Sequence, residues 1–457
     1  MKILVLGFDG ASPKLIDQWL NDLPTFKTFK SEGVFGQTIP PLPAQTPVAW
    51  TTFMTGKKPS NHGIFSFVMR KKGTYERIIA EPGLVKSKNL FQILSENGKR
   101  VCALNVPMCG NNKIRGCVVP GFLTRNEGMF YPHEVREQIR RKFKLGKLRG
   151  DIRTKTLQGV KSDPDLFFEE VNDVTDELAD VSLYLLQNQT WDLFMSVFMG
   201  TDRIQHFFWN TVDESHSKYE RNRYSNFVKN FYVKIDRITR NFLNSVDEDT
   251  VTFVISDHGF CPIEKEVVVN NYLAEPELVK IKNGKVDVEN SKAICYGYGD
   301  IWLNVKGREP CGIVEPGEQY EELRKKIIDQ LMSITIDSKS PLKYVSRSED
   351  IYGLKCLSDG PDLYAVFKTG WQAARNPEIM EQRSNGRYVK DEPMWSGGHD
   401  GTHDPSDVPG ILCASNSRVR RVTDLVLPLQ DIAPSILNLM DVSAPQDLDG
   451  KSYPLIV

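Results

Sequence analysis

Residues 1–10 read MKILVLGFDG, and residues 251–259 read VTFVISDHG. Each stretch has the length and the apolar, β-branched composition of a buried strand, and each runs into an aspartate. These aspartates are Asp9 and Asp257. Two acidic side chains at strand tips predict a metal centre at one edge of a sheet.

Further apolar runs occur along the chain: VCALNV at 101–106, LFMSVFM at 193–199 and GILCAS at 410–415. Amphipathic stretches with helical spacing lie between the runs, at 167–187 and 227–246, and another closes the chain at 429–440. This alternation predicts an α/β fold in which helices cover both faces of a mostly parallel sheet. Ligands of such sheets gather at the carboxyl ends of the strands, where Asp9 and Asp257 are expected.

The composition changes after residue 260, where short strands at 265–273, 292–299 and 300–305, one helix at 318–334 and many Gly and Pro residues follow. We predict an inserted α+β cap over residues 261–393, with the core formed by residues 1–260 and 394–457. A second, more helical insertion is expected over residues 125–180, where charge is dense.

The overall composition excludes several classes of partner. The 58 basic and 59 acidic residues nearly cancel, which argues against a nucleic acid polymer or an anionic membrane as the main partner. No apolar run reaches the roughly 18 residues needed to span a bilayer, and the chain opens on a strand, so we expect a cytoplasmic location. The eight cysteines show no CxxC spacing and are expected to be reduced and mostly packed. The oligomeric state stays open.

Two pairs of side chains have the types and spacing of metal ligands. Asp202 and His206 stand four apart in GTDRIQHFFW, so on a helix they share one face and could hold one ion. The alternative is a helix-start aspartate with a partly buried histidine. Asp257 and His258 could both enter a cleft from a strand end, although Asp-His-Gly also fits a plain turn, as Asp9-Gly10 does.

Two further elements could take part in the same site. His403 lies in the loop SGGHDGTHDPSD, where His399 competes with it for the same role, and the loop also suits a mobile surface segment. Thr46 followed by Pro47 matches an N-cap with proline at the first helical position, and Gly56 matches the helix end. Thr46 would then only cap a helix, or its hydroxyl would face an anion such as a phosphoryl group.

Together these pieces resemble the alkaline phosphatase superfamily, in particular its type I phosphodiesterase and nucleotide pyrophosphatase branch. The resemblance spans most of the core and follows the order of the chain: the first strand with Asp9, the stretch Thr46 to Gly56 followed by KPSNHGI, Asp202-xxx-His206, Asp257-His258-Gly259, and Gly401-Thr402-His403. It implies an alkaline-phosphatase-like three-layer α/β/α core.

The resemblance also implies a site for two divalent metal ions, zinc with manganese and iron as alternatives. One ion would be held by Asp202, His206 and His403, and the other by Asp9, Asp257, His258 and the Thr46 oxygen. Thr46 would be the catalytic nucleophile, forming a phospho-threonine intermediate that water then hydrolyses. An unassisted threonine hydroxyl is a poor nucleophile near neutral pH, which agrees with a nearby cation.

The chain departs from the family pattern at one point. Characterised phosphodiesterases of the family have an asparagine soon after the nucleophile helix that contacts a phosphoryl oxygen, but residues 63–75 contain none. Asn61 and Asn105 are candidates for this role, and neither is assigned.

The leading hypothesis is a two-metal phosphodiesterase or pyrophosphatase acting on a small phosphoester, a nucleotide, or a phosphorylated glycan or lipid precursor. The alternatives are a phosphomonoesterase, a phospho-head-group transferase, or a non-catalytic protein that binds a phosphorylated ligand. Sulfatase activity is disfavoured because Thr46-Pro47-Val48-Ala49 lacks the required cysteine or serine followed by proline and arginine.

Specificity is expected to reside in the two insertions. The aromatic residues Tyr296, Tyr298 and Trp302 could stack on a substrate or form the cap core, and Arg203 could contact a phosphate or pair within the helix layer.

Overall fold

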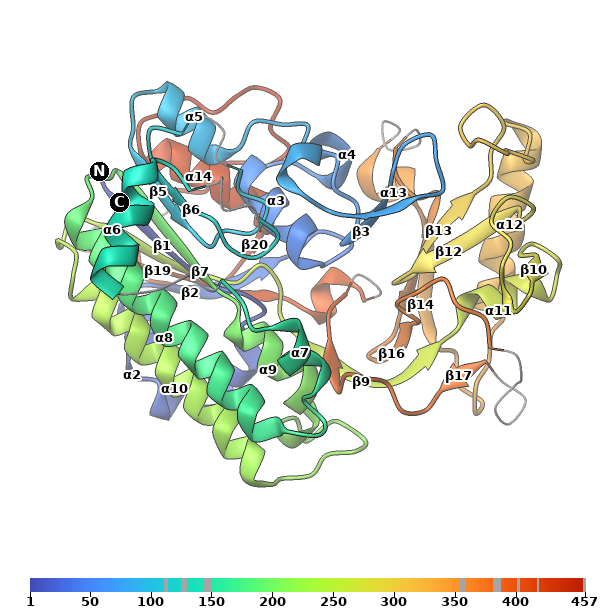
Figure 1. Cartoon of the computed structure of the whole chain (residues 1–457), viewed down its shortest axis with the longest axis horizontal. Helices are drawn as coiled ribbons and strands as arrows, with labels where there is room; N and C mark the ends of the chain where they lie inside the picture. Colours follow the sequence, from blue (N-terminus) through green and yellow to red (C-terminus); the bar gives the residue numbers. More distant parts are fainter. Residues whose placement is uncertain are drawn as a thin grey trace.

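The structure, a computed structural model, describes residues 1–110, 114–124, 130–143, 150–353, 359–380, 388–400, 403–416 and 419–454. A central eight-stranded sheet has the order β20-β2-β19-β8-β1-β7-β5-β6 (Figure 1). Its strands are β1 (Ile3–Phe8), β2 (Val34–Ile39), β5 (Val101–Leu104), β6 (Gly116–Val119), β7 (Leu193–Phe198), β8 (Val251–Ile255), β19 (Gly410–Ser415) and β20 (Val422–Pro428). The five apolar runs of the sequence therefore all lie in this sheet, as β1, β5, β7, β8 and β19.

The sheet is mostly parallel, as predicted, with one exception. Strand β1 runs parallel to both β7 and β8, and β5 runs parallel to β6 and β7. Strand β19 runs antiparallel to β8 and β2. The chain returns from the cap at the carboxyl edge of the sheet, so β19 must cross the sheet in the opposite direction.

The alternation of side chains along β1 builds two separate hydrophobic layers. Leu4, Leu6 and Phe8 pack with helices on one face, and Ile3 and Val5 pack with helices on the other. The first layer contains α2 (Pro24–Glu32), α6 (His133–Phe143), α8 (Pro164–Asn188), α9 (Gly200–Phe208) and α10 (Arg223–Leu243). The second contains α3 (Thr46–Thr55), α5 (Leu90–Glu96) and α14 (Ile432–Leu439). The result is the three-layer α/β/α core that the resemblance implies.

Two long helices form most of the first layer, and both begin with capping side chains. The Asp163 side chain accepts a hydrogen bond from the Leu166 N–H, and Pro164 occupies the first turn of α8. Asn222 and Ser225 form a reciprocal capping box at the start of α10. Within the described part of residues 125–180, the elements are α6, α7 (Thr154–Gln158) and the first half of α8.

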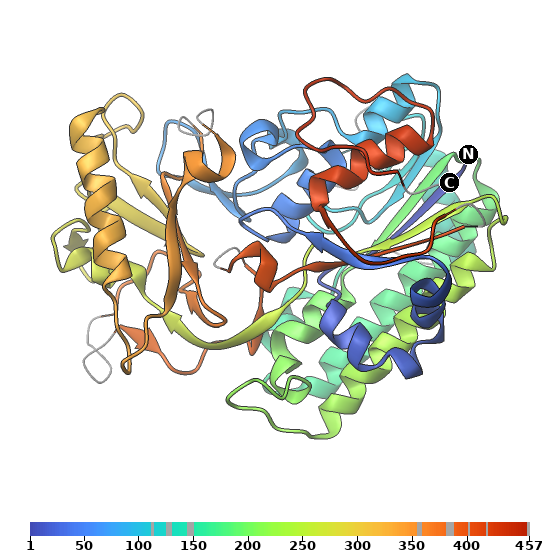
Figure 2. The same cartoon turned by 180° about the vertical axis from the view of Figure 1, so that it is seen from behind.

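The chain from β9 (Cys261–Val267) to β17 (Val389–Lys390) forms small sheets of its own, beside the core in Figures 1 and 2. One sheet has the order β12-β13-β15-β14, and the other has β16-β9-β17, with β18 also paired to β9. The strands are β12 (Ala293–Gly297), β13 (Asp300–Leu303), β14 (Leu342–Arg347), β15 (Leu363–Phe367), β16 (Gly370–Ala373) and β18 (Gly397–Gly398). Helix α12 (Glu318–Met332) packs on this region, whose hydrophobic cluster is separate from both core layers.

One predicted cap strand is half wrong. The stretch 265–273 was expected to be extended, but β9 ends at Val267 and helix α11 spans Val269–Ala274. The Asn270 side chain donates to the Cys295 carbonyl at 2.9 Å and accepts from the Cys295 N–H at 2.9 Å. This tertiary pairing fixes the turn, and a local strand pattern does not reveal it.

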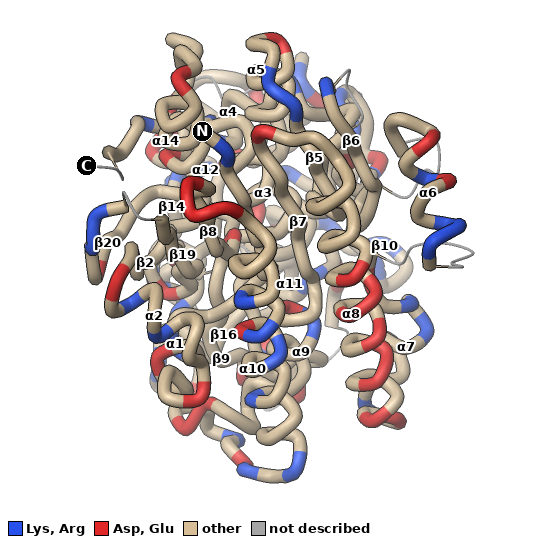
Figure 3. The backbone as a smooth tube through the Cα atoms, turned by 90° about the vertical axis from the view of Figure 1, so that its left-hand side faces the viewer, with Lys and Arg blue, Asp and Glu red and all other residues tan. Residues whose placement is uncertain are grey.

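The remaining elements are short. They include α1 (Pro13–Gln18), α4 (Pro59–His62), α13 (Ser348–Tyr352), the hairpin β3 (Val68–Arg70) with β4 (Arg77–Ile79), and the hairpin β10 (Ile281–Lys282) with β11 (Lys285–Val286). None of the helices that the structure describes is both long and apolar enough to span a membrane. Basic and acidic segments are interspersed along the backbone (Figure 3), as the near-neutral charge balance predicts.

A buried ion pair holds the cap together and can be tested. The Asp362 carboxylate is fully buried and accepts from Arg308 at 2.8 and 2.7 Å, from the Tyr320 hydroxyl at 2.7 Å and from the Leu303 N–H at 2.6 Å. Asp362→Ala removes the shared acceptor of these buried hydrogen bonds, although Arg308 still donates to Glu309. The variant should therefore lose about 3–5 kcal/mol of unfolding free energy. Urea unfolding followed by circular dichroism measures the loss.

The matched control is Glu315→Ala, which removes an ion pair with Lys306 in which both side chains are more than half exposed. This variant should lose less than about 1 kcal/mol. Equal losses in the two variants would contradict the role given to Asp362.

Candidate functional site

Three buried carboxylates follow three neighbouring strands of the central sheet. Asp9 comes directly after β1, Asp257 follows β8, and Asp202 lies in the first turn of α9, just after β7. Because β8, β1 and β7 are adjacent and parallel, their carboxyl ends bring these side chains to one edge. All three residues are at most 1% exposed.

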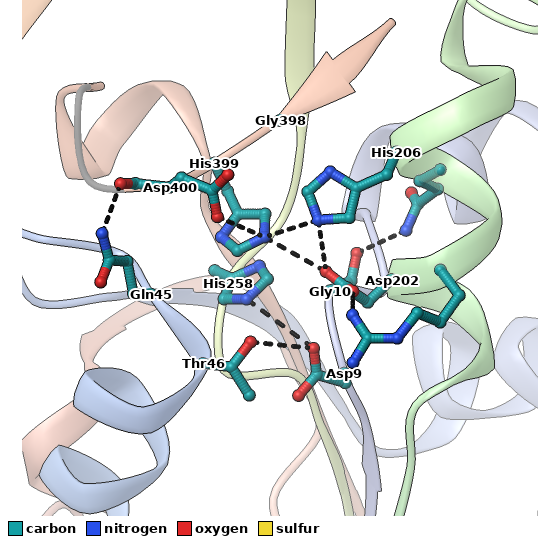
Figure 4. Close-up of polar contacts among 12 residues, drawn as sticks. Asp9, Gly10, Gln45, Thr46, Asp202, His206, His258, Gly398, His399 and Asp400 are labelled. Atoms are coloured by element: carbon teal, nitrogen blue, oxygen red, sulfur yellow. Dashed lines mark hydrogen bonds and ion pairs between the residues drawn. The ribbon is translucent and has the colours of Figure 1, made fainter. Parts of the chain in front are cut away.

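Asp202, His206 and His399 form one group of potential metal ligands. The Nε2 atoms of His206 and His399 lie 3.3 and 3.2 Å from Asp202 Oδ1, and 3.3 Å from each other. Figure 4 shows the two imidazole rings pointing at this one carboxylate oxygen. Their convergence leaves one common point that a cation could occupy.

Asp9, Asp257 and His258 form a second group. His258 Nε2 lies 3.2 Å from Asp257 Oδ2 and 3.8 Å from Asp9 Oδ1. The Thr46 hydroxyl lies 3.5 Å from Asp9 Oδ1, on the same side of the site in Figure 4. The His258 ring stacks on His399 with centroids 3.4 Å apart, so the two groups adjoin.

The outer nitrogens of these histidines are occupied by backbone carbonyls. Nδ1 of His206 lies 3.0 Å from Gly397 O, Nδ1 of His258 lies 3.2 Å from Gly259 O, and Nδ1 of His399 lies 2.7 Å from Ala44 O. If Nδ1 carries the proton in each ring, Nε2 is left with a free lone pair that faces the carboxylates. This is the usual tautomer of a metal-binding histidine.

Several buried atoms at the centre of the site lack a hydrogen-bond partner within the described structure. They are Asp202 Oδ1, Asp257 Oδ2 and His258 Nε2. Buried polar atoms are rarely left unpaired, and each such atom requires an explanation. Histidine nitrogens and carboxylate oxygens are the donors that zinc and related divalent ions prefer. The residues present therefore fit a metal ion in each group.

The electrostatics of the second group agree with this conclusion. Burial, together with the charge of Asp202, raises the pKa of Asp9 to about 8. Burial and the charge of Asp9 also raise the pKa of Asp257 well above its usual range. The metal-free protein thus holds protons where a divalent ion would bind.

The first group carries its charges differently. Burial opposes ionisation of Asp202, but His206 and Arg203 outweigh it and hold the pKa of this carboxyl well below its usual range. Burial likewise disfavours charge on His399, yet Asp400 and Asp202 raise the pKa of this imidazole to about 9. A metal ion at this position would displace the His399 proton.

Helix α3 presents Thr46 to the site. The helix starts at Thr46 itself, with Gln45 as the N-cap residue, so the prediction that Thr46 is the N-cap is wrong by one position. The Gln45 side chain donates to Asp400 O at 2.8 Å and accepts from Ser66 Oγ at 3.1 Å. The Gln45 side chain thus connects the segments that contain Asp400 and Ser66, and the Thr46 hydroxyl is directed at Asp9. Gly56 ends the helix in the left-handed region, as expected.

His403, the third ligand expected with Asp202 and His206, lies elsewhere. Among the described residues, neither group includes His403; its Nε2 lies 3.0 Å from Trp371 O, and burial lowers its pKa to about 4. His399 lies beside Asp202 and His206 in this structure. Residues 397–398 form β18, which pairs with β9 directly after His258, so the strand delivers His399 to the sheet edge.

Two glycines make this convergence possible. Gly10 has φ +67°, donates its N–H to Asp257 Oδ1 at 3.1 Å, and leaves no room for a Cβ against Phe260. A Cβ on Gly397 would lie 2.5 Å from the Trp209 Cβ, so β18 can approach α9 only with glycine there. The pair Gly397-Gly398 before His399 is the sequence signal for this close approach.

Arg203 and the two asparagines have structural partners. Arg203 donates to Asp202 Oδ2 at 2.6 Å and to Asp151 Oδ2 at 2.7 Å, so it orients the metal-ligand candidate. Asn105 donates to Gly150 O and Val197 O and accepts from the Phe122 N–H, and Asn61 donates to Asp449. Both asparagine side chains are therefore engaged away from Thr46.

The fold and the site together define an α/β protein with two groups of potential metal ligands at the carboxyl edge of its sheet. The chain belongs to the type I phosphodiesterase / nucleotide pyrophosphatase family, whose model matches residues 3–403. The predicted resemblance is thereby confirmed. A search of curated protein sequences finds no significant match.

Solved structures of similar fold agree with this family. Human ectonucleotide pyrophosphatase / phosphodiesterase 5 has 14% identity and a TM-score of 0.57, with 99% of this chain and 97% of that chain covered. The murine protein of the same name gives 14% identity, a TM-score of 0.58, and coverages of 97% and 96%. An inactive threonine-to-alanine variant of the murine protein, in complex with AMP, gives a TM-score of 0.57 with the same identity and coverages. At this identity, the similarity establishes the fold.

The raised pKa of Asp9 predicts a pH-dependent effect of Asp9→Asn on the metal-free protein. A group with a raised pKa stabilises the fold at low pH, and this stabilisation is lost as pH rises from about 4 to about 8. The neutral amide avoids the loss, so the variant's melting temperature in EDTA should match the native protein near pH 4 and exceed it increasingly up to pH 8.

Thermal unfolding at each pH, followed by circular dichroism, measures this difference. Asp447→Asn is the control, since this carboxylate is 73% exposed and pairs with Lys57. A constant difference between Asp9→Asn and the native protein across the pH range would refute the electrostatic interpretation.

Proposed function

We propose that this protein hydrolyses small phosphodiesters or pyrophosphates with two divalent metal ions and Thr46 as the nucleophile. The observation that carries the proposal is the Thr46 hydroxyl at the start of α3, 3.5 Å from Asp9 Oδ1 and beside the two groups of potential ligands. Membership of the phosphodiesterase / pyrophosphatase family supports the same reaction class.

In this proposal, Asp202, His206 and His399 hold one ion, and Asp9, Asp257, His258 and the Thr46 oxygen hold the other. Mixed histidine and carboxylate ligands favour zinc, with manganese and iron as the alternatives. When bound, the ions would lower the pKa of the hydroxyl and of water and would neutralise charge on the phosphoryl oxygens.

The chain's own groups prepare Thr46 for attack. The first N–H groups of a helix have no intrahelical partner, so the start of α3 offers donors to a phosphoryl oxygen. Trp50, one turn along α3, donates its Nε1–H to Asp9 Oδ2 at 2.8 Å and thereby fixes Asp9 beside the nucleophile. Arg203 holds Asp202 in the same way.

The reaction then has two displacements. The Thr46 oxygen forms a bond to phosphorus, and the bond from phosphorus to the leaving oxygen breaks, which gives phospho-threonine. Water next attacks the same phosphorus from the vacated side, and the Thr46 oxygen leaves and regains its proton. The AMP bound to the similar murine structure supports nucleotide phosphoesters among the substrates to be tested.

Thr46→Ala should lower turnover of bis-p-nitrophenyl phosphate by at least roughly 10³-fold, because the alanine side chain has no hydroxyl to act as the nucleophile. Nitrophenolate release by zinc-loaded protein measures the rate, and p-nitrophenyl phosphate in parallel compares diester with monoester. Thr55→Ala is the matched control on the same helix, since its hydroxyl is bonded to Thr51 O at 2.7 Å. Full activity of Thr46→Ala would disprove the nucleophile assignment.

His399→Ala should lower the affinity for one of the two ions by more than His403→Ala does. Changing a residue behind a metal ligand already costs about 10- to 100-fold in affinity, so losing a direct ligand should cost more. Chelator competition measures the affinity, and anomalous scattering at the zinc and manganese edges identifies the ions in crystals of each variant. The reverse order of the two variants would reinstate His403 as the ligand.

A further inference from the structure

Each carboxylate of the second group of potential ligands has one oxygen that is already paired with a donor outside the group. Asp9 Oδ2 accepts from the indole Nε1–H of Trp50 at 2.8 Å, and Asp257 Oδ1 accepts from the Gly10 N–H at 3.1 Å. The other oxygens, Asp9 Oδ1 and Asp257 Oδ2, lie 3.8 and 3.2 Å from His258 Nε2. Each carboxylate therefore turns one oxygen toward the group and holds the other in a separate hydrogen bond.

One turn of α3 contacts both oxygens of Asp9. The Thr46 hydroxyl lies 3.5 Å from Oδ1, and Trp50, four residues later, donates to Oδ2. Residues four apart lie on the same face of a helix, so the helix that presents Thr46 also fixes the rotation of the Asp9 carboxylate. Figure 4 shows the contacts of Asp9 with Thr46 and His258 on the same carboxylate oxygen.

The indole of Trp50 is itself held in place by packing. It is fully buried, and its ring meets the Phe53 ring edge-on with centroids 5.7 Å apart. A Cβ on Gly7 of β1 would lie 2.6 Å from Trp50 Cη2, so the strand accommodates the indole only because residue 7 is glycine. The Nε1–H therefore has a fixed direction. Asp9 Oδ2 cannot turn toward the group without leaving this buried N–H unpaired, which is unfavourable.

The first group of potential ligands has the same arrangement. Arg203 donates to Asp202 Oδ2 at 2.6 Å, and Asp202 Oδ1 is the oxygen that lies 3.3 and 3.2 Å from the Nε2 atoms of His206 and His399. The Arg203 guanidinium is also bonded to Asp151 through Nε and Nη2. Every carboxylate of the two groups thus presents a single oxygen to its group.

The number of donor atoms follows from this arrangement. With one oxygen from each carboxylate, the ligand atoms of Asp9, Asp257 and His258 and the Thr46 hydroxyl make four donors. Four donors match tetrahedral zinc, whereas manganese prefers an octahedral set of six, mostly oxygen. If both carboxylates bound an ion through both oxygens, the same residues would supply six donors instead of four.

We infer that Trp50 is a positioning residue that restricts Asp9 to one donor oxygen and thereby makes the second group prefer four-coordinate zinc to six-coordinate manganese. The inference rests on the ion-binding part of the proposed function, and it adds the residue that decides between two ions named there as alternatives. Trp50 contacts neither ion nor substrate in this account, and it acts only through Asp9.

Trp50→Phe keeps an aromatic ring and removes the N–H, so Asp9 Oδ2 becomes free to bind an ion. Removing the hydrogen-bond partner of a metal ligand costs about 10- to 100-fold in affinity, and a second Asp9 oxygen compensates an octahedral ion better than a tetrahedral one. For one of the two bound ions, the Kd for Mn²⁺ divided by the Kd for Zn²⁺ should therefore fall at least about tenfold. Chelator competition with each metal alone measures both values.

The matched control is Trp191→Phe. Trp191 is also buried, and its Nε1–H donates to Leu186 O at 2.9 Å, at the opposite end of β7 from Asp202. This variant should leave the ratio of the two Kd values unchanged. A merely structural role of Trp50 would weaken both metals by the same factor, so an unchanged ratio in Trp50→Phe would overturn the inference.

A measurement on the native protein is independent of how the variant folds. In crystals of the zinc-loaded native protein, Asp9 Oδ1 should lie about 2.0–2.2 Å from the ion, and Oδ2 should keep its hydrogen bond to Trp50. Zinc bound through both Asp9 oxygens would overturn the inference.

These readouts involve no turnover, which separates the inference from the proposed reaction. An unchanged Kd ratio in Trp50→Phe would remove the role of Trp50 even if native protein hydrolyses phosphodiesters through Thr46. A tenfold fall in the ratio would support that role even if no phosphoester is hydrolysed.

Discussion

The site depends on the burial of three carboxylates at the ends of three adjacent strands. A buried carboxylate without compensation is costly, and the usual outcome is protonation or pairing. Asp202 is paired, with Arg203 and two histidines around it, while burial and neighbouring charge raise the pKa of Asp9 and Asp257. A divalent ion at this edge would remove this cost, because it would replace the protons and allow all three carboxylates to ionise. The burial that brings these carboxylates together therefore destabilises the metal-free fold.

The histidines connect this edge to the rest of the molecule. His258 follows β8 of the central sheet, His206 lies on α9, and His399 follows β18, which pairs with β9 at the start of the cap. Each imidazole is oriented by a backbone carbonyl, so small displacements of these segments would move the ring nitrogens. The chain passes from the core into the cap through β9 and returns through β18, and both strands lie beside the site. Its position is therefore coupled to the position of His399.

The sequence predicted the sheet because the five apolar runs are long, β-branched and separated by helical spacing. Strand ends likewise indicated Asp9 and Asp257, and the i, i+4 spacing indicated Asp202 and His206. The antiparallel direction of β19 could not be predicted, because an apolar run does not indicate in which direction its strand crosses the sheet. The position of His399 beside Asp202 depends on a two-residue strand, β18, whose pairing is non-local. Helix α11 replaced a predicted strand because Asn270 bonds to Cys295, a contact that no local pattern encodes.

The potential ligands lie at the carboxyl edge of the central sheet, whereas the cap has its own sheets and its own hydrophobic cluster. In the proposed function, this separation would allow one site to serve a particular substrate. In the proposed function, the groups around Asp9 and Asp202 would recognise features that all phosphoesters share, so they would not distinguish one leaving group from another. Discrimination needs contacts farther from phosphorus, on elements that can vary without moving the ligands. The β3–β4 hairpin meets this condition, because it follows α3 in the chain yet contacts the cap through Tyr75 and Arg70.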